Sequence, residues 1–222
     1  MPGASGQTGR PTPIAPTTSS TTWHSGGSSI GRRVPSALAE LFAALGAALG
    51  EARLRWYLFG AQAAILYGAA RLTADVDVTI EDVDVPSRAL VPALERAGFS
   101  LRVPNVDDFV DRTRVIPIAH DATGIPIDLV LAGPGLEERF FARVREHLIE
   151  GVVVPVASAE DIVVMKVLAS RPKDMDDVRA VLAANVQIDV GLVRATLREL
   201  EMLLDQADLL PAFDDALARA RR

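Results

Sequence analysis

Short apolar runs alternate with longer stretches in which apolar residues recur every three or four positions, so the chain is predicted to contain both strands and helices. The predicted strands are residues 56–59, 75–80, 113–119, 125–131 and 151–156. The predicted helices are residues 36–52, 61–68, 86–96, 136–148, 162–170, 175–184, 190–205 and 210–221. Strands therefore alternate with helices up to about residue 157, and only helices follow. This order predicts an α/β (α+β) fold with a mixed sheet flanked by helices and a C-terminal helical segment.

The strand at residues 75–80 carries two carboxylates at alternate positions. Asp75 and Asp77 lie two residues apart, so both side chains leave one face of the strand while Val76 and Val78 point the other way. Two like charges side by side raise each other's pKa unless a cation lies between them. Mg²⁺ typically takes one or two carboxylates together with substrate phosphates. The spacing therefore predicts a site for Mg²⁺ or Mn²⁺.

A tight turn at Gly60 and Ala61 precedes this strand and opens a short apolar helix. Backbone N–H groups and the helix dipole attract phosphate at such a position. Arg71 and Thr73 come just before the acidic strand, where Arg71 either reaches a phosphate or pairs with Asp75. A phosphate site is thus predicted next to the metal site.

Asp128 is the one charged residue in the apolar strand at residues 125–131. A lone carboxylate in such a strand is costly unless it is paired or binds a metal. The alternative is an edge strand on which Asp128 points into water.

A second group of charged residues lies in the C-terminal helical part. Lys166 stands within an apolar helix, and Arg171, Lys173, Asp174 and Asp177 follow it. A lysine in this setting often extends its ammonium group to the surface. Asp174 is equally well placed to cap the helix predicted from residue 175.

Composition narrows the classes of function. The 222 residues, 49% of them hydrophobic, include no cysteine, which excludes disulfides and thiol catalysis, and the three histidines are not spaced like zinc ligands. The net charge of −6 argues against a protein that coats nucleic acid. No apolar run reaches the roughly 18 residues of a membrane span and no signal segment is visible, so we expect a cytoplasmic protein that does not contact membranes.

The chain divides into three predicted regions. Residues 1–33 are rich in Gly, Ser, Thr and Pro and are predicted to be disordered, with a recognition tail or a misassigned start codon as the alternatives. Residues 34–157 form the predicted α/β core, and residues 158–222 form the helical segment.

The strand, the Gly60 turn, the helix and the sequence Arg71-x-Thr73-x-Asp75-x-Asp77 together resemble the nucleotidyltransferase superfamily with a polymerase-β-like core. The block of Glu160-Asp161, Lys166 and Arg171-Pro172-Lys173-Asp174 is similar to AbiEii-type nucleotidyltransferase toxins. The family turn is Gly-Ser or Gly-Gly, whereas this chain has Gly60-Ala61 and lacks the serine hydroxyl. The two blocks lie within residues 53–184.

The resemblance implies roles for these residues. Asp75, Asp77 and Asp128 would bind metal, Lys166 would contact the triphosphate of an NTP, and Asp174 would orient Lys166 or act near the acceptor. The implied reaction is a two-metal transfer of a nucleotide to a hydroxyl on RNA (such as tRNA), on protein or on a small molecule. The implied biological role is a toxin with a separate antitoxin as its partner. The alternative is a non-catalytic module, antitoxin-like, that binds a nucleotide or a partner.

Overall fold

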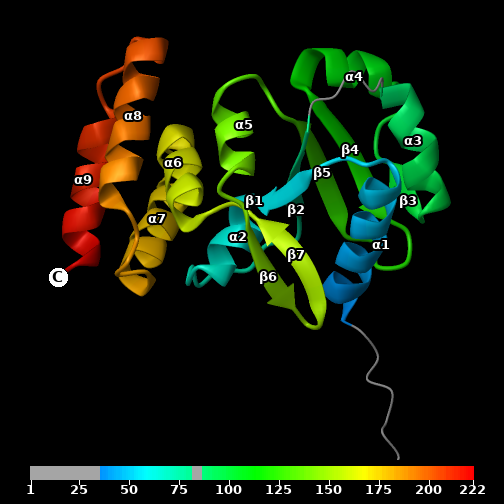
Figure 1. The fold of residues 1–222 in the computed structure, drawn as a ribbon, viewed down its shortest axis with the longest axis horizontal. Coiled ribbons are helices and arrows are strands. Elements are labelled where there is room, and N and C mark those ends of the chain that lie inside the picture. Colours follow the sequence, from blue (N-terminus) through cyan, green and yellow to red (C-terminus); the bar gives the residue numbers. More distant parts are fainter. Residues whose placement is uncertain (1–35, 82–86) are drawn as a thin grey trace, which may run out of the picture. The chain divides into compact units, whose positions relative to one another are not determined.

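A computed structural model describes residues 36–81 and 87–222, and within them the chain forms one seven-stranded mixed sheet (Figure 1). The spatial order is β3-β4-β5-β2-β1-β7-β6. The pairs β2–β5 and β1–β7 are parallel and the other neighbours are antiparallel. The strands are β1 (Trp56–Phe59), β2 (Val76–Ile80), β3 (Phe99–Leu101), β4 (Val115–His120), β5 (Pro126–Leu131), β6 (Arg145–Ile149) and β7 (Val152–Val156).

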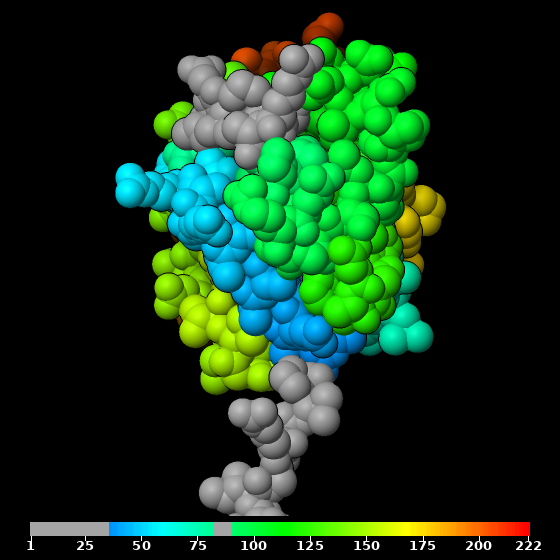
Figure 2. Space-filling model, turned by 90° about the vertical axis from the view of Figure 1, so that its right-hand side faces the viewer, coloured from blue at the N-terminus to red at the C-terminus, as the bar shows by residue number. Residues whose placement is uncertain are grey.

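Helices in the first part of the chain pack against the sheet and against one another. The helix α1 (Ala37–Glu51) begins where the Ser36 side chain accepts a hydrogen bond from the Ala39 N–H, and it packs against β7 and α3 (Ser87–Arg96). In turn, α3 packs on β3, and α4 (Val106–Thr113) packs on β4. Figure 2 shows the face on which α1 and the α3–α4 region lie next to each other.

The C-terminal part consists of helices α6 (Ala159–Ala169), α7 (Pro172–Ala184), α8 (Val190–Leu204) and α9 (Leu209–Ala220). Ser158 caps α6 by accepting a hydrogen bond from the Asp161 N–H. The short helix α2 (Gly60–Leu66) packs against β1 and β2 and also against α6, and so joins these helices to the sheet. Within residues 36–81 and 87–222, no helix has the length and apolar character needed to cross a membrane.

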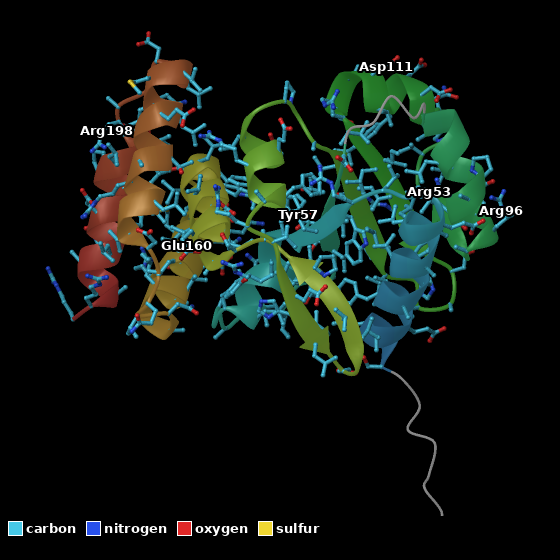
Figure 3. All side chains as sticks on the ribbon, in the orientation of Figure 1. Arg53, Tyr57, Arg96, Asp111, Glu160 and Arg198 are labelled. Atoms are coloured by element: carbon cyan, nitrogen blue, oxygen red, sulfur yellow. The ribbon has the colours of Figure 1, made fainter. Side chains whose placement is uncertain are left out.

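The hydrophobic core is continuous from the sheet into the C-terminal helices. Tyr57 lies at the centre of the fold and is fully buried, whereas Arg53, Arg96, Asp111 and Arg198 lie around its periphery (Figure 3). The ring of Tyr57 packs edge-on against Phe141 of α5 (Leu136–Phe141) at 4.8 Å between ring centroids. Burial of this apolar surface is the main force that holds the sheet and the helices together.

The structure confirms the predicted mixed α/β fold and its helical C-terminal segment. The prediction of one helix over residues 136–148 is wrong. The helix ends at Phe141, and residues 145–149 form β6, which pairs with β7 across a turn at Glu150 and Gly151. The strand β3 and the helix α4 were not predicted. The predicted disorder of residues 1–33 concerns residues outside those that the structure describes.

Candidate functional site

Two of the predicted carboxylates lie side by side on neighbouring strands. Asp77 in β2 and Asp128 in β5 are paired positions of the parallel ladder. Asp75 comes one residue before β2 begins, at the same end of the sheet. Val76 and Val78 are fully buried on the opposite face. The alternation predicted from the sequence is therefore present, and it points both strand carboxylates away from the core.

Gly60 is required by the geometry around Asp77. It ends the crossing from β1 into α2 with φ +67°, and a β-carbon at this position would lie 1.9 Å from Asp77 Oδ2 and 2.9 Å from Asp77 Cβ. Asp77 is paired with Phe59, the last residue of β1, so its side chain lies directly against the turn that begins at Gly60. Only glycine allows both the left-handed backbone and this close approach.

The surroundings shift the pKa values of Asp77 and Asp75 in opposite directions. Burial raises the pKa of Asp77 to about 6, and the charges of Asp75 and Asp128 act in the same direction, while the Ala61 N–H and Lys166 oppose them. A hydrogen bond from the Thr73 hydroxyl lowers the pKa of Asp75. Asp77 is thus the acid whose negative charge is most poorly compensated, which a bound cation would correct.

The opposite wall of the site is an ion network between α6, α7 and the segment before β2. Lys166 is 6% exposed, and its Nζ lies 3.2 Å from Asp174 Oδ1 and 2.7 Å from Asp177 Oδ2. Arg171 also pairs with Asp174. Arg71 pairs with Asp177 at 2.9 Å, rather than with Asp75 as one of the alternatives had it. Asp174 lies in the first turn of α7 and Arg171 is the N-cap residue.

These two walls enclose a cavity of about 230 Å³. All the predicted site residues except Thr73 line it, and Thr73 reaches it through its hydrogen bond to Asp75. The lining residues are Gly60, Ala61, Arg71, Asp75, Asp77, Asp128, Lys166, Arg171, Lys173 and Asp174. Arg171 and Lys173 belonged to the recognised sequence block, but no role was predicted for either.

A larger cavity, of about 310 Å³, lies where β1 begins and β2 ends. Its charged lining consists of Arg55, Glu81 and Glu138, and Arg55 is bound to Glu81. The excess of carboxylates there disfavours a phosphate, so the smaller cavity around Asp77 is the better candidate for a nucleotide site.

The donor groups suit a hard divalent cation, although three acids do not yet converge on one point. Among the described residues, no three Asp, Glu or His side chains are arranged to hold an ion. The Asp128 carboxylate pairs with Arg102, a residue with no signal in the sequence. Asp75 and Asp77 remain as oxygen donors, and two carboxylates together with substrate phosphates make a typical Mg²⁺ site. The residues present therefore fit a cation that arrives with a nucleotide.

Comparisons with known proteins bear on the family and the fold of the chain. The sequence model of a family described as "Nucleotidyltransferase of unknown function (DUF6036)" matches residues 36–208. No curated protein matches the chain. The solved structure of the antibiotic-resistance factor ANT(2'')-Ia is similar, with 18% identity over 74% of this chain and 93% of that chain and a TM-score of 0.50, a likeness that concerns the fold alone.

Two further solved structures match with lower TM-scores. An antigenic nucleotidyltransferase-like protein from Paracoccidioides brasiliensis has 18% identity over 78% of this chain and 90% of that chain, with a TM-score of 0.49. The lincosamide antibiotic adenylyltransferase LnuA, solved with lincomycin bound, has 13% identity over 67% of this chain and 98% of that chain, with a TM-score of 0.44.

Proposed function

Because the chain belongs to the family of nucleotidyltransferases of unknown function named DUF6036, we propose that it transfers a nucleotide from an NTP to a hydroxyl group of an acceptor. The observation that carries this proposal is the cavity of about 230 Å³ with three acids on one wall and, on the other, four cations and one acid. A nucleoside triphosphate with its metal has the complementary arrangement of charge.

The acidic wall is the proposed metal side. Asp75 and Asp77 supply the oxygen donors, and Asp128 faces the acceptor side after it leaves Arg102. A divalent cation such as Mg²⁺ or Mn²⁺, when bound there, neutralises phosphate charge and lowers the pKa of the acceptor hydroxyl; the two-metal arrangement is part of this proposal.

The opposite wall and the turn are the proposed nucleotide side. Cationic side chains at the start of α7 and Arg71 lie around the phosphates, with buried Lys166 behind them in the ion network, and the turn at Gly60 and Ala61 brings backbone close to them. An adjoining cavity of about 150 Å³ offers an apolar surface for the sugar or the base. Its apolar lining is Phe59, Ile162, Met165 and Ala169.

The reaction itself requires positioning more than covalent chemistry. The acceptor hydroxyl releases its proton to water and its oxygen forms a bond to the α-phosphorus, as the bond from that phosphorus to the oxygen shared with the β-phosphate breaks and pyrophosphate leaves. The role of the chain is to hold the reacting atoms in line and to balance their charge.

For the acceptor and the biological role, we propose an AbiEii-like toxin that modifies RNA, such as tRNA, or a protein and is held in check by an antitoxin. This finer proposal is supported by sequence resemblance. The Gly60 turn and the Asp75-x-Asp77 strand resemble the nucleotidyltransferase superfamily, and the block from Lys166 to Asp174 resembles AbiEii-type toxins. A small molecule, as for ANT(2'')-Ia and LnuA, is the alternative acceptor for the same chemistry.

A non-catalytic nucleotide- or partner-binding module is the second candidate function. Two observations favour it: Ala61 replaces the hydroxyl residue of the family turn, and Arg102 pairs with one of the three acids. Such a module would bind an NTP without transferring it.

Isothermal titration of the protein with each NTP, with and without Mg²⁺, tests binding. Incubation with α-labelled NTPs and cell extract then tests transfer to an acceptor. We expect Mg²⁺-dependent binding and labelling, both lost in Asp77→Asn and kept in Asp111→Asn, which changes the same side chain at an exposed position of α4. Binding without labelling selects the non-catalytic module, and equal labelling by wild type and Asp77→Asn refutes the proposed site.

A further inference from the structure

The cations that line the nucleotide cavity differ in whether their charge is already balanced. Lys166 lies between Asp174 and Asp177. Arg171 pairs with Asp174, and Arg71 pairs with Asp177. Both carboxylates are almost fully buried, and burying a carboxylate is costly unless a cation contacts it.

Lys166 is the least available of these cations. It is 6% exposed, and its ammonium group already donates to one carboxylate and contacts a second. Turning it toward a phosphate would leave buried Asp177 with Arg71 alone and would weaken the charge balance around Asp174. Removing one partner from a buried ion pair is strongly unfavourable.

Lys173 is different. It is exposed at the start of α7, and within residues 36–81 and 87–222 it forms no ion pair with a carboxylate. It lines the nucleotide cavity together with Asp75 and Asp77. It also lines a neighbouring cavity of about 460 Å³ beside α7, and Arg71 is the other residue common to both cavities.

We propose that Lys173 is the residue that binds the β- and γ-phosphates of the NTP, and that Lys166 instead positions α7 so that Lys173 faces the cavity. The inference rests on the proposed function and specifies its phosphate subsite. A lysine ammonium is a compact point charge that suits a polyphosphate. The neighbouring cavity is then the side on which the end of the phosphate chain extends and by which pyrophosphate leaves.

The neutral substitution Lys173→Met tests the assignment by titration with NTP and with the matching NMP, in the presence of Mg²⁺. We expect the Kd for the NTP to rise about tenfold, the loss of one favourable charged contact, while the Kd for the NMP changes by less than about twofold. The melting temperature stays at the wild-type value because Lys173 is exposed and has no ion-pair partner among the described residues. Lys173→Arg keeps the charge and retains NTP affinity within about threefold.

Two further variants separate this role from general effects. Arg198→Met removes one positive charge from an exposed position of α8, and Arg198 lines neither cavity, so we expect wild-type binding of both ligands. Lys166→Met is expected to lower the melting temperature and, below that temperature, to raise the Kd for the NTP more than the Kd for the NMP, whereas a purely structural residue would change the melting temperature alone.

Three outcomes overturn the assignment. NTP binding by Lys173→Met equal to that of wild type refutes it while leaving the proposed function intact. An equal loss in Lys173→Met and Arg198→Met shows a nonspecific effect of net charge. A wild-type protein that binds no NTP with Mg²⁺ refutes both the assignment and the proposed function.

Discussion

Replacing Gly60 by alanine would put a methyl group where the Asp77 side chain lies. The new β-carbon would be 1.9 Å from Oδ2, 2.7 Å from Cγ and 2.9 Å from Cβ of Asp77. Rotation of the carboxylate relieves the first two contacts but not the third, because the Cβ of Asp77 is fixed by the pairing of β2 with both β1 and β5. Either β2 or the turn has to move.

The expected loss of stability has two parts. A non-glycine residue in the left-handed region costs about 1–2 kcal/mol. Overpacking adds about 1–3 kcal/mol. Gly124 provides a matched control, because its φ of +68° nearly equals the +67° of Gly60 while a β-carbon added to Gly124 would meet no atom within 4 Å. Gly124→Ala should therefore lose only the stability that a non-glycine residue costs in the left-handed region.

Urea denaturation measures the stability of both variants, and the transfer assay measures their activity per folded molecule. We expect Gly124→Ala to keep wild-type transfer. The transfer activity of Gly60→Ala should fall by about a hundredfold or more, because a displacement of about 1 Å at a reacting centre has an effect of this size. Equal stability of the two variants together with wild-type transfer by Gly60→Ala would refute the constraint that Gly60 places on Asp77.

Three other substitutions test separate parts of the structure. In metal-free protein, Asp77→Asn should gain stability relative to wild type as the pH rises from 3.8 to about 6. The pKa of Asp77 is raised in the folded state, so over this range the wild-type protein loses the proton that favours folding, whereas the asparagine variant has no such proton to lose. Denaturation at a series of pH values checks this, and a constant difference in stability would contradict it. Arg102→Gln should raise the affinity for Mn²⁺ about threefold, because Asp128 is then free to bind the metal. The free energy of unfolding should change by less than about 1 kcal/mol, since the ion pair is exposed. Unchanged affinity in a calorimetric titration would show that Arg102 does not compete with the metal. Asp161→Ala should destabilise the protein by roughly 3–5 kcal/mol, because Asp161 is buried and pairs with Arg143. Transfer per folded molecule should stay unchanged. An unaltered urea midpoint would contradict the stabilising role of this ion pair.

The parts of the fold that the sequence predicted are those whose signal is local. Alternation around Asp75 and Asp77, the turn at Gly60 and the apolar strands on either side of residues 120–124 each identified an element that the structure contains. The helix α6 was recognisable from Ser158 and the acidic residues after it. In each case a few consecutive residues carry the pattern.

The error at residues 136–148 has a physical reason. Residues 145–149, Arg-Glu-His-Leu-Ile, do not show the strict alternation of a strand, because β6 is an edge strand with one neighbour. What fixes the strand is the turn at Glu150 and Gly151, both with positive φ, which returns the chain to pair with β7. The Glu-Gly pair before an apolar run was the available signal.

The candidate site was predicted as a set of residues but not as a network of charges. The pairing of Asp128 with Arg102 and that of Arg71 with Asp177 join positions 26 and 106 residues apart. No local pattern encodes which of several nearby charges will meet. Which cations are free to bind a phosphate therefore followed only from the folded structure.

The register between β2 and β5 has a consequence for how this framework can change. Asp77 and Asp128 are opposite each other because the apolar residues on either side of them are locked into the interior. These neighbours are Val76, Val78, Ile127 and Leu129, all of them fully buried. A slip of one position by either strand would expel the two of these residues that it carries into water, so alignment is maintained without help from the acids themselves. Replacing either acid by asparagine should accordingly change the ligands that the site offers while leaving the pairing of the two strands intact.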